Sequence, residues 1–554
     1  MAVSRSVNSK KSLSLALLPA MVVAASAPAA HAFTFESDDW KGYWDNTVTY
    51  NLGFRARDVN DKIGNNPAFD ESEYKFKDRG DVVTNRFNLL TELGGTYRDK
   101  FALRVSAQGW HDFAYDDDVE SNPGDYAPGV SYESLSAYPS GKYRSGVKHE
   151  YVTGGRLLDA FVQYSDSLDG HSYTARVGRN TQYWGNGLFF PFQSISYSQG
   201  AMDGIAGSAS PGTPAKALFI PRSQVNLSTQ LGSSFALGFQ YFLENAENIL
   251  PQGGTYLAPA DFLFTGQDSL LGVPRGNNEH APDINNNYGL NATWQVTPDA
   301  TLGFYFRRLD EVQPWAPLMR MEGASPSYFI SYNEDVKLYG ISLDAPLGES
   351  SLGMELSYRD GTALNSTAGF VADDPSRGAT GNVANLVANV LVPLSTTPLY
   401  ETGTFIAELA YTRVLSVDGT NKALYNGEGY AGCSGGKWSG CSTRNATALA
   451  LSFTPEWIQV APGLNLSMPS SVTMGLKGNA GVLGGTAQGS YKYSIGVAAT
   501  YLSKHTLKVE YIGTRAHAGD TVLTPAGQEV YEGGNGPYMM NDRDWISITA
   551  QTVF

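Results

Sequence analysis

The chain has 554 residues and a formal net charge of −15, and without a basic run this acidity argues against a nucleic-acid partner. Its length exceeds one ordinary globular core of roughly 100–200 residues, whereas a closed barrel can grow by adding strands to one sheet. Charged residues make up 17% of the chain, below the roughly 25% of soluble domains. The mean hydropathy of −0.24 nevertheless argues against a helical membrane protein.

The first 32 residues have the organisation of a secretory signal peptide. Arg5, Lys10 and Lys11 precede an apolar stretch at residues 13–25, and Ala30-His31-Ala32 matches a small-residue cleavage site. The sequence therefore predicts a mature chain of one domain, residues 33–554. Downstream of the signal the sequence has no run of 18 apolar residues, so we expect no transmembrane helix.

Alternating apolar and polar residues dominate the mature chain in chain order. Such segments predict half-buried strands, and pairs of them separated by short turns predict hairpins. The pairs are residues 87–97 with 101–107, 225–231 with 235–241, 288–296 with 302–306, 341–343 with 352–358, and 493–501 with 507–511.

Long polar or glycine-rich segments separate these hairpins, as at residues 115–150, 243–285 and 513–543. Short turns alternating with long loops are typical of an outer-membrane barrel, with both chain ends in the periplasm and the long loops outside. We expect an all-β, antiparallel transmembrane barrel of about 18 strands, or 16 because residues 382–409 are hard to divide. Residues 545–554 alternate up to an aromatic Phe554 and should close the barrel against the first strand. The alternative fold is a soluble sandwich or propeller.

Side chains opposite to the apolar set of each strand should face the lumen. A lumen lined by both signs of charge favours small polar or charged solutes. The alternative is that these charges only hydrate the wall and pair across it. The predicted pore-lining residues are Arg55, Arg57, Glu92, Arg104, Gln108, Arg176, Gln224, Asn226, Gln240, Arg307, Glu355, Arg359, Glu408, Lys508 and Glu510.

Several of the predicted external loops are apolar, notably residues 184–197 and 249–273. Apolar groups left in water cost roughly 25 cal/mol per Å², so these segments should fold into the lumen, pack on each other or bind an apolar ligand. The simpler interpretation of these apolar residues is that they pack the loops against each other or against the barrel wall. The alternative is a hydrophobic selectivity element, for which the candidates are Trp184, Phe189, Phe190, Phe262 and Phe264.

Two cysteines, Cys433 and Cys441, lie eight residues apart in a glycine-rich segment. We predict that they form a disulfide in an oxidising compartment, because a two-thiolate metal site lacks nearby ligands. The acidic stretch at residues 116–120 lacks a fixed ligand spacing and predicts a solvated loop, with binding of calcium or of ion-bridged lipopolysaccharide as the alternative. We expect no bound metal and no cofactor.

Catalytic signals are weak in this sequence. The histidines at positions 149, 280 and 517 fall in predicted external loops, and those at 171 and 505 fall in turns. No G-x-S-x-G or H-E-x-x-H motif occurs, and no acid–base pair is assembled by the predicted strands. We therefore predict no catalytic residues and no enzymatic activity.

Near its predicted mature start and again at the Trp184 region, the chain resembles the Domain of Unknown Function 1302 family. The resemblance is carried by Phe33-Thr34-Phe35, by Trp44-Asp45-Asn46-Thr47 with Tyr50 and Arg55, and by residues 176–180 leading to Trp184-Gly185. It implies a proteobacterial outer-membrane barrel over essentially the whole mature chain. It also implies an association with hydrophobic compounds such as lipids, sterols or aromatic carbon sources, and supplies no catalytic residues.

Together these features predict a channel in the outer membrane of a Gram-negative bacterium that passes hydrophobic or amphipathic small molecules. One alternative is a general or anion-preferring porin for small hydrophilic solutes. Another is a structural or adhesion barrel whose external loops bind partners. The expected partners are outer-membrane lipid and lipopolysaccharide, the barrel assembly machinery, and a small-molecule substrate that the sequence does not identify.

Overall fold

The computed structural model describes residues 33–210, 212–213, 215–263, 266–276, 286–316, 318–322, 325–367, 377–419 and 421–554. The predicted signal peptide and Phe264 lie outside the described residues.

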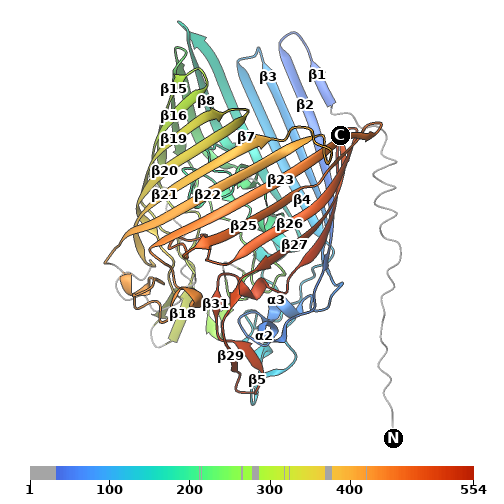
Figure 1. Ribbon diagram of the computed structural model, residues 1–554, viewed down its shortest axis with the longest axis vertical. Coiled ribbons are helices and arrows are strands. Elements are labelled where there is room, and N and C mark those ends of the chain that lie inside the picture. The colour runs from blue at the N-terminus through green and yellow to red at the C-terminus, as the bar shows by residue number, and fades with distance from the viewer. Residues whose placement is uncertain are drawn as a thin grey trace.

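The described chain forms one antiparallel sheet that closes on itself as a barrel of 18 strand positions (Figure 1), which confirms the predicted fold and strand number. β24 and β25 share one position, because β23 and β26 pair with both. The barrel strands are β2 (Trp40–Arg55), β3 (Val82–Tyr97), β4 (Phe101–Asp112), β7 (Thr153–Leu168), β8 (His171–Asn180), β11 (Arg222–Leu231), β12 (Phe235–Phe242), β15 (Tyr288–Thr297), β16 (Ala300–Leu309), β19 (Val336–Leu347), β20 (Ser350–Ala363), β21 (Thr380–Pro393), β22 (Thr402–Val417), β23 (Asn445–Ala461), β24 (Leu464–Ser467) with β25 (Ser470–Lys477), β26 (Tyr491–Tyr501), β27 (His505–Arg515) and β32 (Trp545–Val553).

Closure is made by the last strand, as the alternation at residues 545–554 predicts. β32 pairs with β27 on one side and with β2 on the other, from Thr47 opposite Val553 to Arg55 opposite Trp545. The backbones of Asn46 and Phe554 exchange two hydrogen bonds of 2.7 and 2.9 Å beyond the end of this ladder. The barrel therefore has no free edge along the paired length of its first and last strands.

The segment at residues 382–409, which the sequence leaves undivided, contains parts of two strands. β21 ends at Pro393 and β22 begins at Thr402, and residues 394–401 form the turn between them. Proline has no backbone N–H to donate to a ladder, so a strand ends easily there. This division gives 18 strand positions rather than 16.

Short turns gather at one end of the barrel and long connections at the other. The short-turn end also holds β1 (Phe33–Glu36), paired to β2, and the C-terminus (Figure 1). One of the two-residue turns is Asp169-Gly170 between β7 and β8, where φ is 50° and 79°. Two successive residues with positive φ are typical of the type I′ turns that match the twist of a hairpin.

The outward faces of the strands are apolar around the barrel. Phe304, Ile341 and Leu356 face outward on three neighbouring strands and are 43%, 48% and 55% exposed. The inward-facing Gln240, on the same wall, is 0% exposed because lumen segments cover it. An apolar outer face on a closed ladder is what a strand barrel needs in lipid, because every backbone group is paired within the sheet.

The long connections at the loop end carry short elements. The strand pairs are β5 (Asp125–Ala127) with β6 (Val130–Ser131), β9 (Ala201–Met202) with β10 (Phe219–Ile220), β13 (Ser269–Leu270) with β14 (Val273–Pro274), β17 (Leu318–Glu322) with β18 (Ser325–Phe329), β28 (His517–Ala518) with β31 (Gly534–Asn535), and β29 (Thr521–Leu523) with β30 (Glu529–Tyr531). The helices are α2 (Asp61–Gly64), α3 (Asp70–Tyr74), α4 (Ser145–Tyr151), α5 (Gly204–Ala209), α6 (Ala215–Leu218), η1 (Glu133–Leu135), η2 (Lys422–Leu424), η3 (Lys437–Ser439) and η4 (Tyr538–Met540).

The predicted disulfide between Cys433 and Cys441 is confirmed, with a Cα–Cα distance of 5.8 Å, in the connection between β22 and β23. Among the helices of the described chain, every one is too short or too polar to cross a membrane.

Candidate functional site in the barrel lumen

Residues 181–200, here called the inner segment, run from the end of β8 along the inner wall of the barrel. Two wall glutamates hold it through its backbone. Glu355 on β20 accepts hydrogen bonds from the N–H groups of Asn186, Gly187 (2.7 Å) and Ile195 (2.7 Å). The sequence predicts that Glu355 and the second glutamate, Glu408, face the lumen. The structure places Glu355 beneath the inner segment, with 2% of its surface exposed.

Glu408 on β22 makes the second anchor. Its carboxylate accepts from the N–H groups of Leu188, Phe189 and Phe190 at 2.6, 2.7 and 2.9 Å. The side-chain amide of Asn389 donates to it as well, at 3.1 Å. Three consecutive backbone donors converging on one carboxylate fix the path of the segment, because charge-assisted hydrogen bonds are stronger than neutral ones.

Two wall arginines complete the attachment. Arg307 donates through Nη1 to the carbonyl oxygens of Ile195 (3.0 Å) and Tyr197 (2.7 Å). The guanidinium of Arg359 lies 4.0 Å from the centroid of the Tyr197 ring, a cation–π geometry. Arg307 and Arg359 are 0% and 1% exposed, so they hold the inner segment and do not border open space.

The apolar side chains of the inner segment pack on the wall. Trp184, Ile195 and Tyr197 form a buried cluster with Leu309, Val336 and Leu338. Phe190 packs with Val387, Ala410, Ala448 and Ala450, and Phe189 lies against this group. Phe262 belongs to a different cluster, around Ile63, Phe69, Ala260 and Tyr538. The described contacts are those of loop packing, and a selectivity role for these residues stays a prediction.

The remaining predicted pore-lining residues fall into polar groups on the inner wall or at its rim. Each group is internally hydrogen-bonded or ion-paired, as expected for polar wall residues that pair across strands. Arg104 contacts Glu92 and Asp159, and Arg176 donates a hydrogen bond to Gln163. A separate hydrogen-bonded group consists of Gln224, Asn226, Gln240 and Asn180. Lys508 pairs with Glu510 at 2.7 Å. Arg57, half exposed at the rim, pairs with Asp544 at 3.3 Å, and Gln108 lines a cavity described below.

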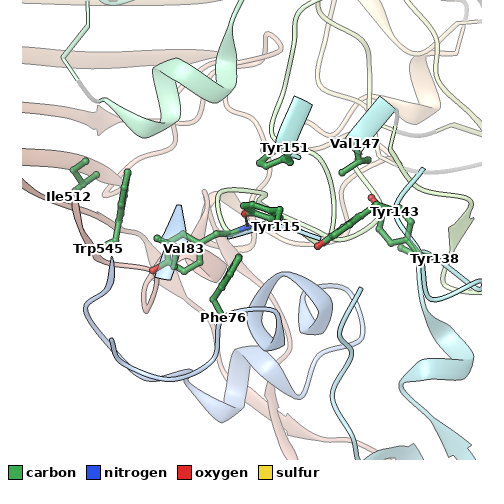
Figure 2. Packing of buried hydrophobic residues seen from close by; sticks show 11 residues of the cluster. Phe76, Val83, Tyr115, Tyr138, Tyr143, Val147, Tyr151, Ile512 and Trp545 are labelled. Atoms are coloured by element: carbon green, nitrogen blue, oxygen red, sulfur yellow. Dashed lines mark hydrogen bonds between the residues drawn. The ribbon is translucent and has the colours of Figure 1, made fainter. Parts of the chain in front are cut away.

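External connections close over the loop end through an aromatic cluster. Figure 2 shows Tyr115 lying between Phe76 and Tyr151, with both pairs of ring centroids 5.1 Å apart. The cluster joins three loop regions to the wall strands β3, β27 and β32. Its other buried members are Val83, Ala137, Tyr138, Tyr143, Val147, Tyr256, Ile512 and Trp545.

A buried charge cluster lies beside these rings. Arg55, at the end of β2, pairs with Glu73 at 2.7 Å, and Arg543 pairs with the other oxygen of Glu73. Burial raises the pKa of Asp542, which lies 3.5 Å from Arg55, to about 7. Asp261 accepts from the N–H groups of two residues of α3, and burial raises its pKa to about 6. Thus Arg55, predicted from the sequence to line the pore, is instead part of the closure of the loop end, 1% exposed.

Two cavities border wall strands on which the inner segment is not anchored. The first, here the Arg86 chamber, has a volume of about 430 Å³ and is bounded by β2, β3, α5 and the loop residues Tyr151 and Leu257. Its polar lining includes Thr47, Thr49, Asn51, Asn88, Gln108 and Gln551, with the charged residues Arg86, Asp112, Glu150 and Asp203. Its apolar lining includes Val83, Ile205, Ala206, Ala209 and Leu257.

The second cavity, here the Lys492 chamber, has a volume of about 370 Å³ and lies against β25, β26 and β27. Leu257 and Trp545 border both chambers, and α5 contributes Ser208 to one and Ala209 to the other. The two chambers are therefore neighbours separated by one partition. Trp545, whose indole is 3% exposed, belongs to that partition.

Sequence reasoning missed Lys492, Trp545 and Arg543 as lumen residues. For Lys492 a signal existed, because it precedes Tyr493, which the alternation places on the outward face of β26, so residue 492 must face inward. The same signal existed for Trp545, which precedes Ile546 on the outward face of β32, whereas Arg543 lies in a connection without alternation. Among the residues that the structure describes, no group of three or more His, Cys, Asp or Glu is placed to hold a metal ion.

A closed ladder of 18 strands with an apolar outer face and a polar inner wall defines a transmembrane β-barrel. The chain belongs to the family described as protein of unknown function (DUF1302), whose model matches residues 13–554. No curated protein matches the chain.

Among solved structures, the chain is similar to OccAB1 of Acinetobacter baumannii at 10% identity and a TM-score of 0.42, covering 95% of this chain and 98% of that one. OccAB4 of the same organism gives 10% identity and 0.40, covering 94% and 98%. OpdK of Pseudomonas aeruginosa, solved with vanillate, gives 9% and 0.40, covering 92% and 98%. Likeness at this level says nothing about what this chain binds or conducts.

Proposed function

We propose that this protein is an outer-membrane channel that passes hydrophobic or amphipathic small molecules. The observation that carries the proposal is the mixed lining of the Arg86 chamber. A cavity of about 430 Å³ lies in the range of small-molecule sites. Apolar side chains of α5 and Leu257 border it together with polar and charged wall residues, and this combination suits a molecule with one apolar and one polar part.

The proposal includes an orientation and a location. The long connections face the cell exterior and the short-turn end faces the periplasm of a Gram-negative bacterium, because outer-membrane barrels have short periplasmic turns and longer external loops. Lipopolysaccharide then surrounds the loop end, and the barrel assembly machinery inserts the chain. We infer no catalysis and no cofactor for this function.

The test uses a porin-depleted Gram-negative strain, in which hydrophobic and hydrophilic solutes both cross the outer membrane slowly. We expect expression of the protein to increase the entry rate of N-phenyl-1-naphthylamine, a hydrophobic fluorophore, more than the hydrolysis rate of nitrocefin, a hydrophilic β-lactam. Ala206 is exposed to the chamber, so Ala206→Trp should fill it and lower fluorophore entry severalfold. Ala526→Trp, in an exposed loop away from the chamber, is the matched control.

Each alternative has its own outcome. A general porin would raise both rates in the same proportion, and Ala206→Trp would then leave their ratio unchanged. An adhesion or structural barrel would raise neither rate, although the protein reaches the outer membrane. Either result contradicts the proposed selectivity.

A further inference from the structure

The Lys492 chamber differs from the Arg86 chamber in its charge. Its lining includes two cationic side chains, Lys492 and Arg543, and no aspartate or glutamate. The Arg86 chamber is bordered by Asp112, Glu150 and Asp203. In a chain with a net charge of −15, a cavity whose charged lining residues are both cationic needs an explanation.

Lys492 projects inward from the second position of β26, at the loop end of this strand. Its Nζ donates to the carbonyl oxygen of Ser208 at 2.8 Å and weakly to that of Gly207 at 3.4 Å, at the end of α5. Throughout the described ranges, no carboxylate oxygen lies within 4.0 Å of it. Thr473 and Thr514 are its register partners on β25 and β27, so two hydroxyl-bearing side chains flank the ammonium on the same face.

Arg543 reaches the chamber from the last external connection. Its Nε is paired with Glu73, and its Nη1 donates to the carbonyl oxygens of Ala258 (2.6 Å) and Tyr256 (3.2 Å). Its Nη2 is buried and has no hydrogen-bond acceptor within the part of the chain that the structure describes. Protein atoms cover this N–H, so a ligand in the chamber does not reach it, and Arg543 borders the chamber through other atoms of its side chain.

The rest of the lining is largely apolar. Leu250, Leu257, Ile512, Met540 and Trp545 border the cavity, together with three prolines. The indole Nε1 of Trp545 is also buried without a partner among the described residues. The chamber thus offers an apolar surface large enough for a hydrocarbon or aromatic body next to the Lys492 ammonium.

We propose that the Lys492 chamber binds amphipathic organic monoanions, with the anionic head on Lys492 and the hydrophobic body against Leu257 and Trp545. This rests on the proposed channel function and names the charge class of its substrate. A carboxylate attached to a hydrocarbon or aromatic body fits both parts of the lining. A neutral molecule of the same shape leaves the Lys492 ammonium without an anionic partner.

The test is equilibrium binding to the full-length purified protein in detergent, followed by ¹⁹F NMR. The probes are 4-(trifluoromethyl)benzoate and its neutral isostere 4-(trifluoromethyl)benzamide. We expect the benzoate to bind at least about tenfold more tightly, since a hydrogen bond to a charged group contributes about 1.4 kcal/mol or more, which is a factor of ten. Lys492→Gln should abolish this difference, and Lys492→Arg should restore most of it.

Lys508→Gln is the matched control, because Lys508 lies on the neighbouring strand β27 but is paired with Glu510 and does not border the chamber. It should keep the preference for the benzoate. Lys492 also contacts the end of α5, and a purely structural role would weaken benzoate and benzamide equally in Lys492→Gln. Equal affinity of the two probes in the native protein would overturn the proposal even if no variant assembles.

Failure of the channel function gives a different result. If the native protein discriminates benzoate from benzamide but raises no solute flux, the anion site stands and the channel proposal falls. If flux is present without discrimination, the channel stands and the anion site falls.

Discussion

At the scale of single residues, Glu355 and Glu408 decide where the inner segment lies. Each accepts three backbone N–H groups through both carboxylate oxygens. A glutamine in either place has one accepting oxygen, and its amide N–H₂ would face backbone donors. Each loss leaves a buried N–H unsatisfied at a cost of about 1–3 kcal/mol.

We therefore expect Glu355→Gln and Glu408→Gln to loosen the inner segment without unfolding the barrel. In planar bilayers the variants should show a larger mean conductance and more frequent current fluctuations than the native protein, because an obstruction in the lumen becomes mobile. Glu92→Gln is the control, since Glu92 pairs with Arg104 on the wall and contacts no part of the inner segment. Unchanged conductance in both anchor variants would contradict the anchoring role.

At the scale of elements, hairpins and loops differ in how far the sequence determines them. Residues 225–231 and 235–241 alternate strictly, and the structure pairs Leu231 with Phe235 across the turn as that pattern requires. Polar wall positions such as Gln224 also follow from parity alone. The inner segment has no period, and Phe190 meets Val387 and Ala410, about 200 positions away in the chain. Such contacts depend on the closed barrel and on no local propensity.

The same limit applies to the cluster that closes the loop end. The alternation puts Arg55 on the inward face of β2, but its partner Glu73 belongs to α3, a five-residue helix inside a connection. Nothing in the spacing of Asp70, Glu71 and Glu73 indicates that Asp261 lies against them. The composition of the loops could be read from the sequence, while their mutual packing could not.

This cluster predicts a pH dependence of the loop end. Burial raises the pKa of Asp261 to about 6, and burial also raises the pKa of Asp70 and Glu71 well above their usual values. Above pH 4 the packed loop end thus binds more protons than a loop end in which these carboxyl groups are exposed to water. The stability of the packed loop end is therefore greatest at low pH and falls as pH rises from about 4 through 6.

Hydrogen exchange of α3 and of the segment around Asp261, corrected for the intrinsic effect of pH, should be faster at pH 8 than at pH 5. The variant Asp261→Asn removes one titrating group and should reduce the difference between the two pH values. Slower corrected exchange at pH 8 would show that ionised carboxylates stabilise this cluster and would contradict the assignment.

At the scale of the whole molecule, the barrel depends on a ladder between strands that are about 500 residues apart in the chain. β2 and β32 pair over nine registered positions from Thr47 opposite Val553 to Arg55 opposite Trp545. In lipid an open edge would leave unpaired backbone groups, each costing several kcal/mol, so closure and membrane insertion are one requirement. The side chains at this seam are linked too, since Asn51 donates to the hydroxyls of Ser547 and Thr549 at 2.8 Å.

Closure can be tested by a covalent link across the seam. Thr49 and Gln551 are directly opposite each other and face the lumen, and opposed residues have Cβ atoms about 4.5–5.5 Å apart, close to what a disulfide spans. In a background with Cys433→Ser and Cys441→Ser, the double variant Thr49→Cys/Gln551→Cys should form a disulfide on mild oxidation. The product encloses most of the chain in one loop, so after boiling without reductant it should migrate faster in a denaturing gel than the reduced form.

A mismatched cysteine pair is the control that distinguishes paired neighbouring strands from strands that are only near each other in the lumen. Thr506 lies opposite Gln551 on the far side of β32, so it is two strands away from Thr49, roughly 10 Å at a strand spacing of about 4.8 Å. The pair Thr49→Cys/Thr506→Cys should therefore stay reduced under the same conditions. Equal cross-linking of the two pairs would mean that the first and last strands are not held in register. A cross-link in the matched pair alone establishes the seam at the register observed here, because a slip by one residue would turn Gln551 to the outer face.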